Sequence, residues 1–415
     1  MTVELGANFF RHEYGRLVAM LSRRVGMHRL EAVEDAVQFA LLAALESWPK
    51  AAVPDNPSAW LYRVAHNHFV GEERSRARRD ELLGQDAEPA PDAAGDPPVL
   101  LGGDVRDELL QMLFVCCDDA LPVESQVVLA LKTLCGFEVR EIAERLFTTE
   151  ANVYKRLGRA RSRLAEAAYD PDFTIEQLGA RLPAVRSVLY TLFTEGYLSS
   201  QADGAIRREL CDEAIRLAEI LAEHPATAAP ETFALLALMH LHSARMTARQ
   251  DGSGGLLLLE EQDRSRWDQD QIHVGLSWLA RAAEGNVFSR YHAEAGIAAE
   301  HCLAASLADT RWERIVECYS LLDQTSPSPI HTLNRAVAIG EWRSPAEALA
   351  EIEGLEPPSW LEGSHLWSAV LADLHARCGH AELARRYREA ALSAAPSDAI
   401  RAALARRLMN GDRAG

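Results

Sequence analysis

The sequence of 415 residues contains no apolar segment long enough to cross a membrane. A membrane-spanning helix needs about eighteen or more consecutive apolar residues, and no stretch approaches that length. The N-terminal segment MTVELGANFFRHEYGR also lacks the basic start and apolar run of a secretory signal peptide. We therefore expect a soluble, cytoplasmic protein with no membrane partner.

Cysteine is scarce, and its spacing does not suit a disulfide framework. The seven cysteines are an odd number and include no C-x-x-C pair. Cys116 and Cys117 are adjacent, so they cannot face one partner together on a helix. A disulfide scaffold is not expected, and the composition suits a reducing compartment.

Motifs for catalysis and for cofactors are missing as well. His66 and His68, like His240 and His242, stand two residues apart, so each pair points to different faces of a helix and suits one metal ion poorly. The glycine-rich segment RQDGSGG lacks the Lys-Ser/Thr ending of a phosphate loop, and no nucleophile elbow is present. The sequence predicts no catalytic residue, no metal site and no cofactor, and a protein that is not an enzyme.

Runs of alternating β-branched residues, which are typical of strands, are absent from residue 175 onward. Helical periodicity runs through residues 9–25, 31–48, 57–79, 105–117 and 123–134 and through nearly every later segment. A chain of this length exceeds what one core usually supports, so two or three domains are expected. We predict an all-α, multidomain protein.

The chain as a whole has no excess of positive charge. Its net charge is −18. Counts of Lys plus Arg against Asp plus Glu are 11 and 10 for residues 1–80, 0 and 6 for 81–104, 9 and 10 for 105–168, and 23 and 35 for 169–415. Only the first and third parts can approach a polyanion, through local patches, and the acidic remainder should stay away from DNA.

The cleanest boundary is the segment GQDAEPAPDAAGDPPVLLGGD at 84–104, which has no basic residue. Its Pro, Gly, Ala and Asp content cannot bury enough surface to fold, so it reads as an acidic, extended linker. We predict helical domains at 1–80 and 105–168 on either side of a linker at 81–104. Further helical domains are predicted at 169–285 and 286–415.

What is present is a cationic helix in the segment EVREIAERLFTTEANVYKRLGRARSR at 138–163. Apolar residues share one face in each half of this segment, and Thr148, Thr149 and Glu150 supply helix-cap chemistry between the halves. The pattern predicts a helix-turn-helix. Its second helix carries five basic residues and no acid, namely Lys155, Arg156, Arg159, Arg161 and Arg163.

The polar side of this second helix has the spacing of a DNA-reading face. Asn152, Arg156, Arg159 and Arg163 follow four-three-four spacing, so they share one face and can reach phosphates and base edges in a major groove. A solvated charged helix is the alternative.

A second basic helix is predicted at NPSAWLYRVAHNHFVGEERSRARR, residues 56–79. Trp60 lies on its apolar face, while Arg63, Asn67, Arg74 and Arg76 lie on a basic, hydrogen-bonding face. Aromatic and guanidinium groups side by side suit phosphate neutralisation and stacking with unpaired bases. A purely structural role for the tryptophan is the alternative.

An earlier helix turns a polar edge, formed by Glu34, Asp35 and Gln38, toward solvent. Its packing residues are Val33, Ala36, Val37 and Ala40. An ordinary solvated helix surface is the alternative to a function for this edge.

These parts, in this order, resemble a known family. VEDAVQ at 33–38, PSAWLYRVAHN at 57–67, the acidic linker and LPVESQVVLALKTLCGFEVREIAERLFTTEANVYKRLGRARSRL at 121–164 resemble regions two and four of extracytoplasmic-function sigma factors, within the sigma-70 family. The remainder, including FTEGYLSS at 193–200 and LLEEQDRSRWD at 258–268, is similar to the long C-terminal extension of a subgroup that ends in tetratricopeptide-like repeats.

The repeat itself is best supported for about 287–410, whereas a generic helical bundle remains open for 175–285. Between 365 and 398, small and terminating residues fall where a repeat of about thirty-four residues places them, namely Leu371, Ala372, Gly379, Ala384, Ala391 and Pro396.

The resemblance implies a factor that binds core RNA polymerase and promoter DNA, through the clamp helices of the largest subunit and the flap, and helps to melt promoters. It implies core binding by Glu34, Asp35 and Gln38. It implies contacts near the minus-ten element by Trp60, Arg63, Asn67, Arg74 and Arg76. It implies contacts to the minus-thirty-five element by Thr149, Asn152, Lys155, Arg156, Arg159, Arg161 and Arg163.

The sequence departs from the family pattern at four positions. Phe39 stands where an acid is common, Phe147 and Ala151 stand where glycine is often found, and Tyr154 stands where lysine is frequent. These differences bear on the promoter sequence more than on the class of function.

The C-terminal half is interpreted as a built-in regulator that receives a protein or peptide in a repeat groove, with a structural, solubilising role as the alternative. Two rival functions for the whole chain stay open. One is a stand-alone helix-turn-helix DNA-binding regulator whose repeats serve oligomerisation. The other is a repeat scaffold or an enzyme in the C-terminal half, which would need a convergent polar pocket.

Overall fold

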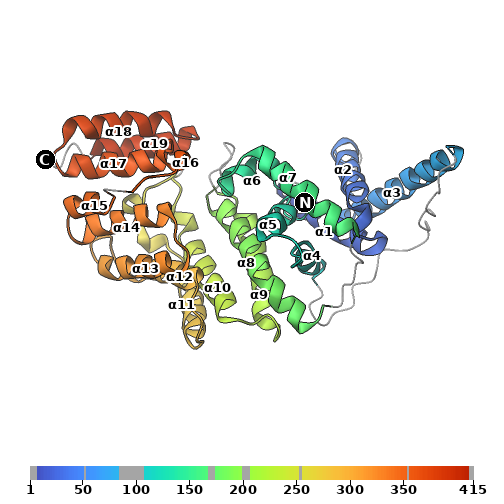
Figure 1. The fold of residues 1–415 in the computed structure, drawn as a ribbon, viewed down its shortest axis with the longest axis horizontal. Coiled ribbons are helices and arrows are strands. Elements are labelled where there is room, and N and C mark those ends of the chain that lie inside the picture. The colour runs from blue at the N-terminus through green and yellow to red at the C-terminus, as the bar shows by residue number, and fades with distance from the viewer. Residues whose placement is uncertain are drawn as a thin grey trace. The chain divides into compact units, whose positions relative to one another are not determined.

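The computed structural model describes residues 7–50, 53–83, 107–166, 173–198, 206–251, 255–352 and 355–410. These residues form helices and no strand, with one isolated β-bridge between Gln250 and Leu256 (Figure 1). The predicted all-α class is therefore confirmed. The chain divides into two compact units, a first unit Met1–Val188 and a second unit Leu189–Gly415.

The helices of the first unit lie close to the predicted ranges. They are α1 Ala7–Val25, α2 Leu30–Ser47, α3 Pro57–Leu82, α4 Glu108–Cys116, α5 Val123–Thr133, α6 Val139–Arg145 and α7 Glu150–Glu166. The predicted linker falls almost wholly on residues 84–104, which lie outside the described residues, because α3 continues to Leu82.

Local signals explain where α3 begins and how it is held. The side-chain oxygen of Asn56 accepts a hydrogen bond from the backbone N–H of Ala59 at 3.0 Å, and Pro57 occupies the first turn. The apolar face of α3 packs against small buried side chains of α2. An ion pair between Arg29 and the buried Glu73 fixes the start of α2 to the middle of α3.

The predicted helix-turn-helix is formed by α6 and α7, which pack on each other and on α5. The backbone N–H of Thr148 donates to the carbonyl of Ala143 at 2.9 Å and closes the turn. Phe147, just before it, has a φ of 48°, in the left-handed region. Glycine adopts this conformation without a steric penalty, which gives a physical reason for the glycine that the family often carries there.

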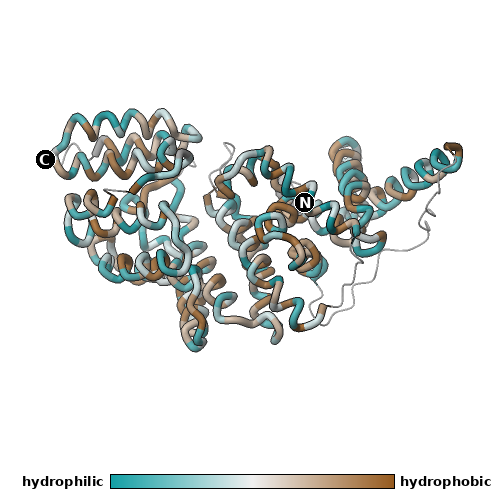
Figure 2. The backbone as a smooth tube through the Cα atoms, viewed as in Figure 1, coloured by the Kyte–Doolittle hydropathy of each residue, from teal (hydrophilic) through white to brown (hydrophobic). Residues whose placement is uncertain are grey.

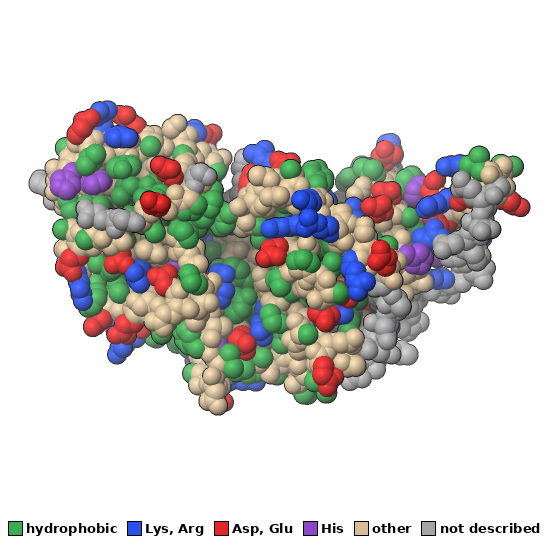
Figure 3. All heavy atoms as spheres, in the orientation of Figure 1, with side chains coloured by type: hydrophobic (Ala, Val, Ile, Leu, Met, Phe, Trp, Pro, Cys, Tyr) green, Lys and Arg blue, Asp and Glu red, His purple; other side chains and the backbone are tan. Residues whose placement is uncertain are grey.

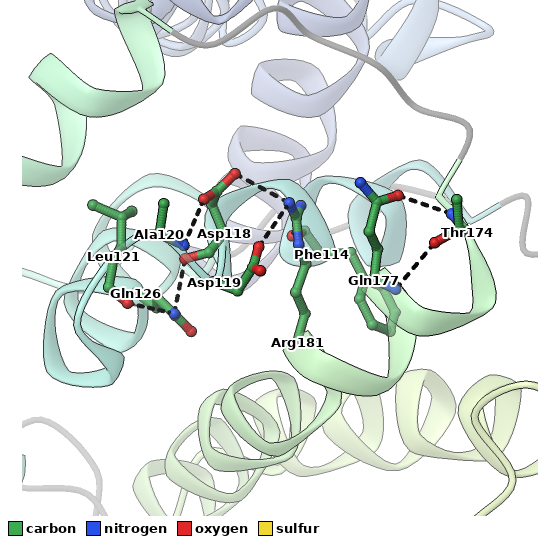
Figure 4. A network of polar contacts seen from close by, with 9 residues as sticks. All are labelled: Phe114, Asp118, Asp119, Ala120, Leu121, Gln126, Thr174, Gln177 and Arg181. Atoms are coloured by element: carbon green, nitrogen blue, oxygen red, sulfur yellow. Dashed lines mark hydrogen bonds and ion pairs between the residues drawn. The ribbon is translucent and has the colours of Figure 1, made fainter.

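Helix α8, Ile175–Tyr197, begins the C-terminal extension, and its first half belongs to the first unit. Arg181 reaches from α8 to the end of α4, where it donates to the carbonyl of Phe114 at 3.0 Å and to Asp118 at 3.1 Å (Figure 4). Its guanidinium also lies 5.0 Å from the centre of the Phe173 ring. Because Arg181 is only 8% exposed, this contact anchors the start of the extension to the α4–α7 bundle.

In the second unit, successive helices from α9 to α15 pack on one another, and α15, α17, α18 and α19 continue the series. Hydrophobic and hydrophilic residues alternate along α17 and α18 (Figure 2). The bounds are α9 Arg208–Glu223, α10 Pro230–Ser243, α11 Gln269–Ala283, α12 Arg290–Leu303, α13 Trp312–Thr325, α14 Pro329–Trp342, α15 Pro345–Ile352, α16 Ser359–Glu362, α17 His365–Arg377, α18 Ala381–Ser393 and α19 Asp398–Asn410.

The segment with the predicted repeat spacing coincides with α17 and α18, and its tetratricopeptide type stays a prediction. All seven cysteines are free thiols, and those at 116 and 117 are buried. Among the described helices, none has both the length and the apolar composition needed to cross a membrane.

Candidate nucleic-acid interface

Helix α7 presents a row of cations on its outer side. Its buried face consists of Val153, Leu157, Ala160 and Leu164. On the other side, Asn152, Lys155, Arg159 and Arg163 are exposed and Arg156 is half-buried. Within the part of the chain that the structure describes, none of these four basic side chains forms an ion pair. Lys and Arg side chains gather over α7 in Figure 3, so this surface can accept the phosphates of a nucleic acid.

The start of α7 orients this row. Thr149 is exposed, and its hydroxyl oxygen accepts a hydrogen bond from the backbone N–H of Asn152 at 3.3 Å, as an N-cap does. The amide of Asn152 also donates to the hydroxyl of Thr148 at 3.3 Å. Tyr154, one of the departures from the family pattern, is 62% exposed beside the row and can contact a base.

Helix α3 carries the second predicted surface. Arg63, Asn67, Arg74 and Arg76 are exposed. Trp60 is half-buried, and its ring lies edge-on to the ring of Trp48, with 5.4 Å between centroids. The aromatic pair fixes the orientation of Trp60 while leaving one side accessible, which fits both the stacking role and the structural role considered for it.

The three polar residues predicted to form one edge of α2 do not all face solvent. Asp35 and Gln38 are exposed as predicted, but Glu34 is only 6% exposed, so the expectation that it faces solvent is wrong. The sequence pattern of α2 alone gave no reason to turn Glu34 inward. The partners that hold it come from α5 and α7, about a hundred residues away in the chain.

Glu34 lies in a polar cluster between α2, α5 and α7. One carboxylate oxygen accepts from the guanidinium of Arg161 at 2.5 Å, and the other accepts from the hydroxyl of Thr133 at 2.9 Å. Arg161 also contacts the carboxylate of Glu31 at 3.4 Å. Burial raises the pKa of Glu34 above its ordinary value, although Arg161 and the hydrogen bond from Thr133 both act in the opposite direction.

Arg161 is therefore not part of the exposed row on α7. It stands two residues after Arg159, so it points to another side of the helix, toward α2. In this structure a residue predicted to bind DNA and a residue predicted to bind core polymerase are bound to each other.

A second contact joins the same two parts of the chain. Gly15 of α1 lies so close to the carbonyl of Leu134, after α5, that a β-carbon at this position would be 1.9 Å from the oxygen. No side chain fits there, so glycine is required. The sequence predicted two helical domains on either side of the linker. The structure shows them packed within one unit, because Glu34, Arg161 and Gly15 supply a complementary interface.

Sequence reasoning missed an apolar strip on the outer side of α2. Phe39 is 46% exposed, Leu42 60% and Leu45 53%, and they follow Asp35 and Gln38 at helical spacing. The ring of Phe39 stacks on the ring of His68 at 3.9 Å between centroids. Exposed apolar residues clustered on one helix are typical of a protein-binding surface. Their three-residue spacing in the sequence was the available signal.

No group of three or more His, Cys, Asp or Glu side chains among the described residues has the geometry to hold a metal ion. His66 and His240 are buried, and the latter contacts Gln271 at 2.7 Å. The exposed charged and apolar side chains of α2, α3 and α7 are suited to binding macromolecules.

Parts of both units match known family models. Residues 9–79 match sigma-70 region 2, residues 111–164 match sigma-70 region 4, and residues 181–283 match DUF6596, a family of unknown function. The chain is 36% identical to an uncharacterized protein of Rhizobium meliloti over 334 residues, which cover 79% of this chain and 78% of that relative. No solved structure matches.

Proposed function

Because the chain belongs to the sigma-70 family, we propose that it is an RNA polymerase sigma factor of the extracytoplasmic-function type, acting in the cytoplasm. Sigma-70 regions 2 and 4 imply binding to core RNA polymerase and to promoter DNA, in a family of initiation factors that are not enzymes. The observation that carries the DNA-reading part of the proposal is the cationic row of α7, which lies inside region 4 and forms no ion pair among the described residues.

The outer side of α2 is the proposed docking surface for core polymerase. Asp35 and Gln38 offer a carboxylate and an amide to a basic partner, and the apolar strip Phe39, Leu42 and Leu45 offers area to bury beside them. This combination of a polar group and adjacent apolar residues suits the clamp helices of the largest subunit. Region 4 would then reach the flap of the polymerase.

The exposed side chains of α7 are proposed to read the minus-thirty-five element, with Asn152, Arg156, Arg159 and Arg163 in the major groove. Those of α3, including Arg63 and Asn67, are proposed to hold the melted minus-ten element. Each guanidinium that neutralises a phosphate contributes about 0.9 to the slope of log affinity against log salt.

The packed arrangement of regions 2 and 4 is proposed to be a closed form of the free factor. Glu31 precedes Asp35 by four residues and Glu34 precedes Gln38 by four, so α7 lies along one edge of the docking surface. Binding to polymerase would have to separate Arg161 from Glu34 and free both helices. Strand opening is then driven by binding energy and not by a chemical step.

The C-terminal extension is proposed to regulate the separation of regions 2 and 4 through a protein or peptide partner. The contact that supports a physical link is Arg181, which ties α8 to Phe114 and Asp118 of region 4. A partner that displaced α8 would disturb the end of α4 directly.

The docking proposal is tested by competition for core polymerase between a labelled reference sigma factor and this chain. Asp35→Ala should weaken competition by about tenfold or more, whereas Glu72→Ala, an exposed acid on α3, should leave it unchanged. Equal competition by the Asp35 variant and the parent would contradict the docking surface. Tight promoter binding without polymerase would instead favour the stand-alone regulator.

A further inference from the structure

The second unit contains a cluster of arginines that form no ion pair with any carboxylate among the described residues. Arg245, Arg249 and Arg264 all come from the segment that follows α10, and within the described residues none of them forms an ion pair. The absence is unexpected, since residues 169–415 carry 35 acidic against 23 basic side chains. Buried charges in proteins are normally paired.

Two of these arginines are accounted for by helix ends. Arg264 donates to the carbonyls of His301 at 2.6 Å and of Ala304 at 2.8 Å, at the C-terminus of α12. Arg249 donates to the carbonyl of Tyr197 at the end of α8, and its guanidinium lies 3.7 Å from the centre of that ring. A cation at a helix C-terminus is stabilised by the unsatisfied carbonyls there. These contacts account for the burial of Arg249. They satisfy only one of the two terminal nitrogens of Arg264, Nη1.

Arg245 has no such partner. It is 9% exposed, and within the described residues its guanidinium donates to the side-chain oxygen of Gln262 over a long distance of 3.4 Å. Its guanidinium lies 5.0 Å from the centre of the Trp267 ring, and that of Arg264 lies 4.6 Å from the same centre. Two like charges thus share one indole ring, and the repulsion from Arg245 acts on Arg264 more strongly than the attraction of the Asp309 carboxylate does.

Hydrogen-bonding groups around Arg245 are also left without partners. Four nitrogen atoms in this cluster are buried and have no hydrogen-bond partner among the described residues, namely Nε of Arg245, Nη2 of Arg264, Nε1 of Trp267 and Nδ1 of His301. Burial, together with the charge of Arg245, lowers the pKa of His301 to about 3, so its ring is neutral at pH 7 and can donate from one nitrogen. Buried donors without acceptors are rare in native structures.

His301 also belongs to the wall of a cavity of about 210 Å³ between α12, α13 and α14. Trp312 and Tyr319 contribute aromatic walls, Asn334 contributes an amide, and Glu260, Glu341 and Arg407 also line the cavity. The ring of Trp312 lies edge-on to that of His301 at 5.5 Å between centroids. The cavity gives room for the body of a small molecule beside the cationic cluster.

We propose that Arg245, Arg264, Trp267 and His301 form a binding site for the oxyanion group of a small organic ligand, a phosphate or a carboxylate. The guanidiniums supply charge and forked donors, and the indole and imidazole N–H groups complete the coordination of the oxygens. The ligand body occupies the adjacent cavity. This site lies wholly in the second unit and does not depend on the proposed role in transcription.

The experiment measures thermal unfolding of the full-length protein in potassium phosphate, potassium acetate and potassium chloride at equal ionic strength. Saturable stabilisation by phosphate or by acetate, beyond that in chloride, is expected. At tenfold excess over Kd the rise in Tm should be about 3–6 °C. The two oxyanion arms distinguish a phosphate ligand from a carboxylate ligand, and no saturable effect of either would overturn the proposal.

Arg245→Met separates a binding role from a structural one. Removing an unbalanced buried charge should raise the Tm of the ligand-free protein and abolish the response to the anion. Arg311→Gln, which removes an exposed arginine paired with Glu300 at 2.7 Å, should keep the response. A lower Tm together with an unchanged anion response in Arg245→Met would contradict the site. Should that variant fail to fold, Arg264→Gln replaces it. Loss of the anion response in Arg264→Gln would support the site, and an unchanged response would contradict it.

Discussion

The carboxylate of Glu34 on α2 and the guanidinium of Arg161 on α7 are 2.5 Å apart, although 127 positions separate them in the sequence. Arg161 neutralises the buried Glu34, and Thr133 satisfies its second oxygen. The pair therefore links the helix proposed to dock on polymerase with the helix proposed to read DNA. Breaking it is the step that the proposed closed form requires.

Arg161→Gln should raise the affinity for core polymerase, because it removes the contact that competes with docking. A part-buried pair of this kind has a coupling energy of about 1–3 kcal/mol, so a several-fold increase is expected. The matched control is Arg163→Gln, an exposed residue of the same helix, which should change nothing. Binding is measured without DNA, and an affinity that falls or stays equal in Arg161→Gln would argue against the closed form.

Arg159→Ala should weaken promoter binding by the complex with polymerase. Its guanidinium is exposed on α7, and loss of one phosphate contact reduces the salt slope by about 0.9, while loss of a base contact costs about 1–3 kcal/mol. Arg386→Ala, an exposed arginine of the second unit, is the control and should leave both affinity and slope unchanged. Measuring affinity at several salt concentrations separates the two kinds of contact.

Arg181→Ala should destabilise the first unit by about 2–4 kcal/mol. The substitution leaves the carbonyl of Phe114 without its donor and the half-buried Asp118 without its cation. Urea unfolding monitored by circular dichroism measures the loss, and Arg385→Ala, on the exposed surface of α18, should cost less than about 1 kcal/mol. A loss no larger than that of the control would show that the contact in Figure 4 does not anchor α8.

The second unit should lose stability as the pH falls below about 6.5. Burial, followed by the charge of Arg245, lowers the pKa of both His242 and His301 to about 3, so both fold as neutral rings. The unfolded chain takes up their protons between pH 6.5 and pH 3, so the stabilisation is complete above that window and declines through it. About 1–2 kcal/mol should be lost for each ring by pH 5.

Thermal unfolding at pH 7 and at pH 5 measures this loss. His242→Asn and His301→Asn together should flatten the pH dependence of the free energy of unfolding. An equally steep dependence in the double variant would show that other groups cause it.

The sequence was sufficient for features that depend on neighbouring residues. Helix bounds, the cap at Thr149, the exposed row on α7 and the two sigma-70 regions all follow from local periodicity or motif order, and the family matches confirm the resemblance to regions 2 and 4. The roles of individual side chains in binding polymerase and DNA stay predictions. The extracytoplasmic-function type, the repeat type and the regulatory partner do as well.

Features created by contacts between distant segments were not predictable in this way. Glu34 and Asp35 are adjacent acids on one helix, and only the approach of α5 and α7 makes the first buried and leaves the second exposed. The requirement for glycine at position 15 likewise comes from the carbonyl of Leu134. That Arg245 forms no ion pair among the described residues likewise becomes visible only once its neighbours in space are known.

Run-off transcription with purified core RNA polymerase tests the central claim most directly. Core polymerase is compared with and without the full-length protein on genomic DNA fragments, and transcripts are mapped at their start sites. We expect discrete starts that appear only with the protein, each preceded by a shared pair of sequence elements, and their loss in Arg159→Ala. Transcription that is unchanged by the protein, or starts that share no upstream elements, would contradict the assignment.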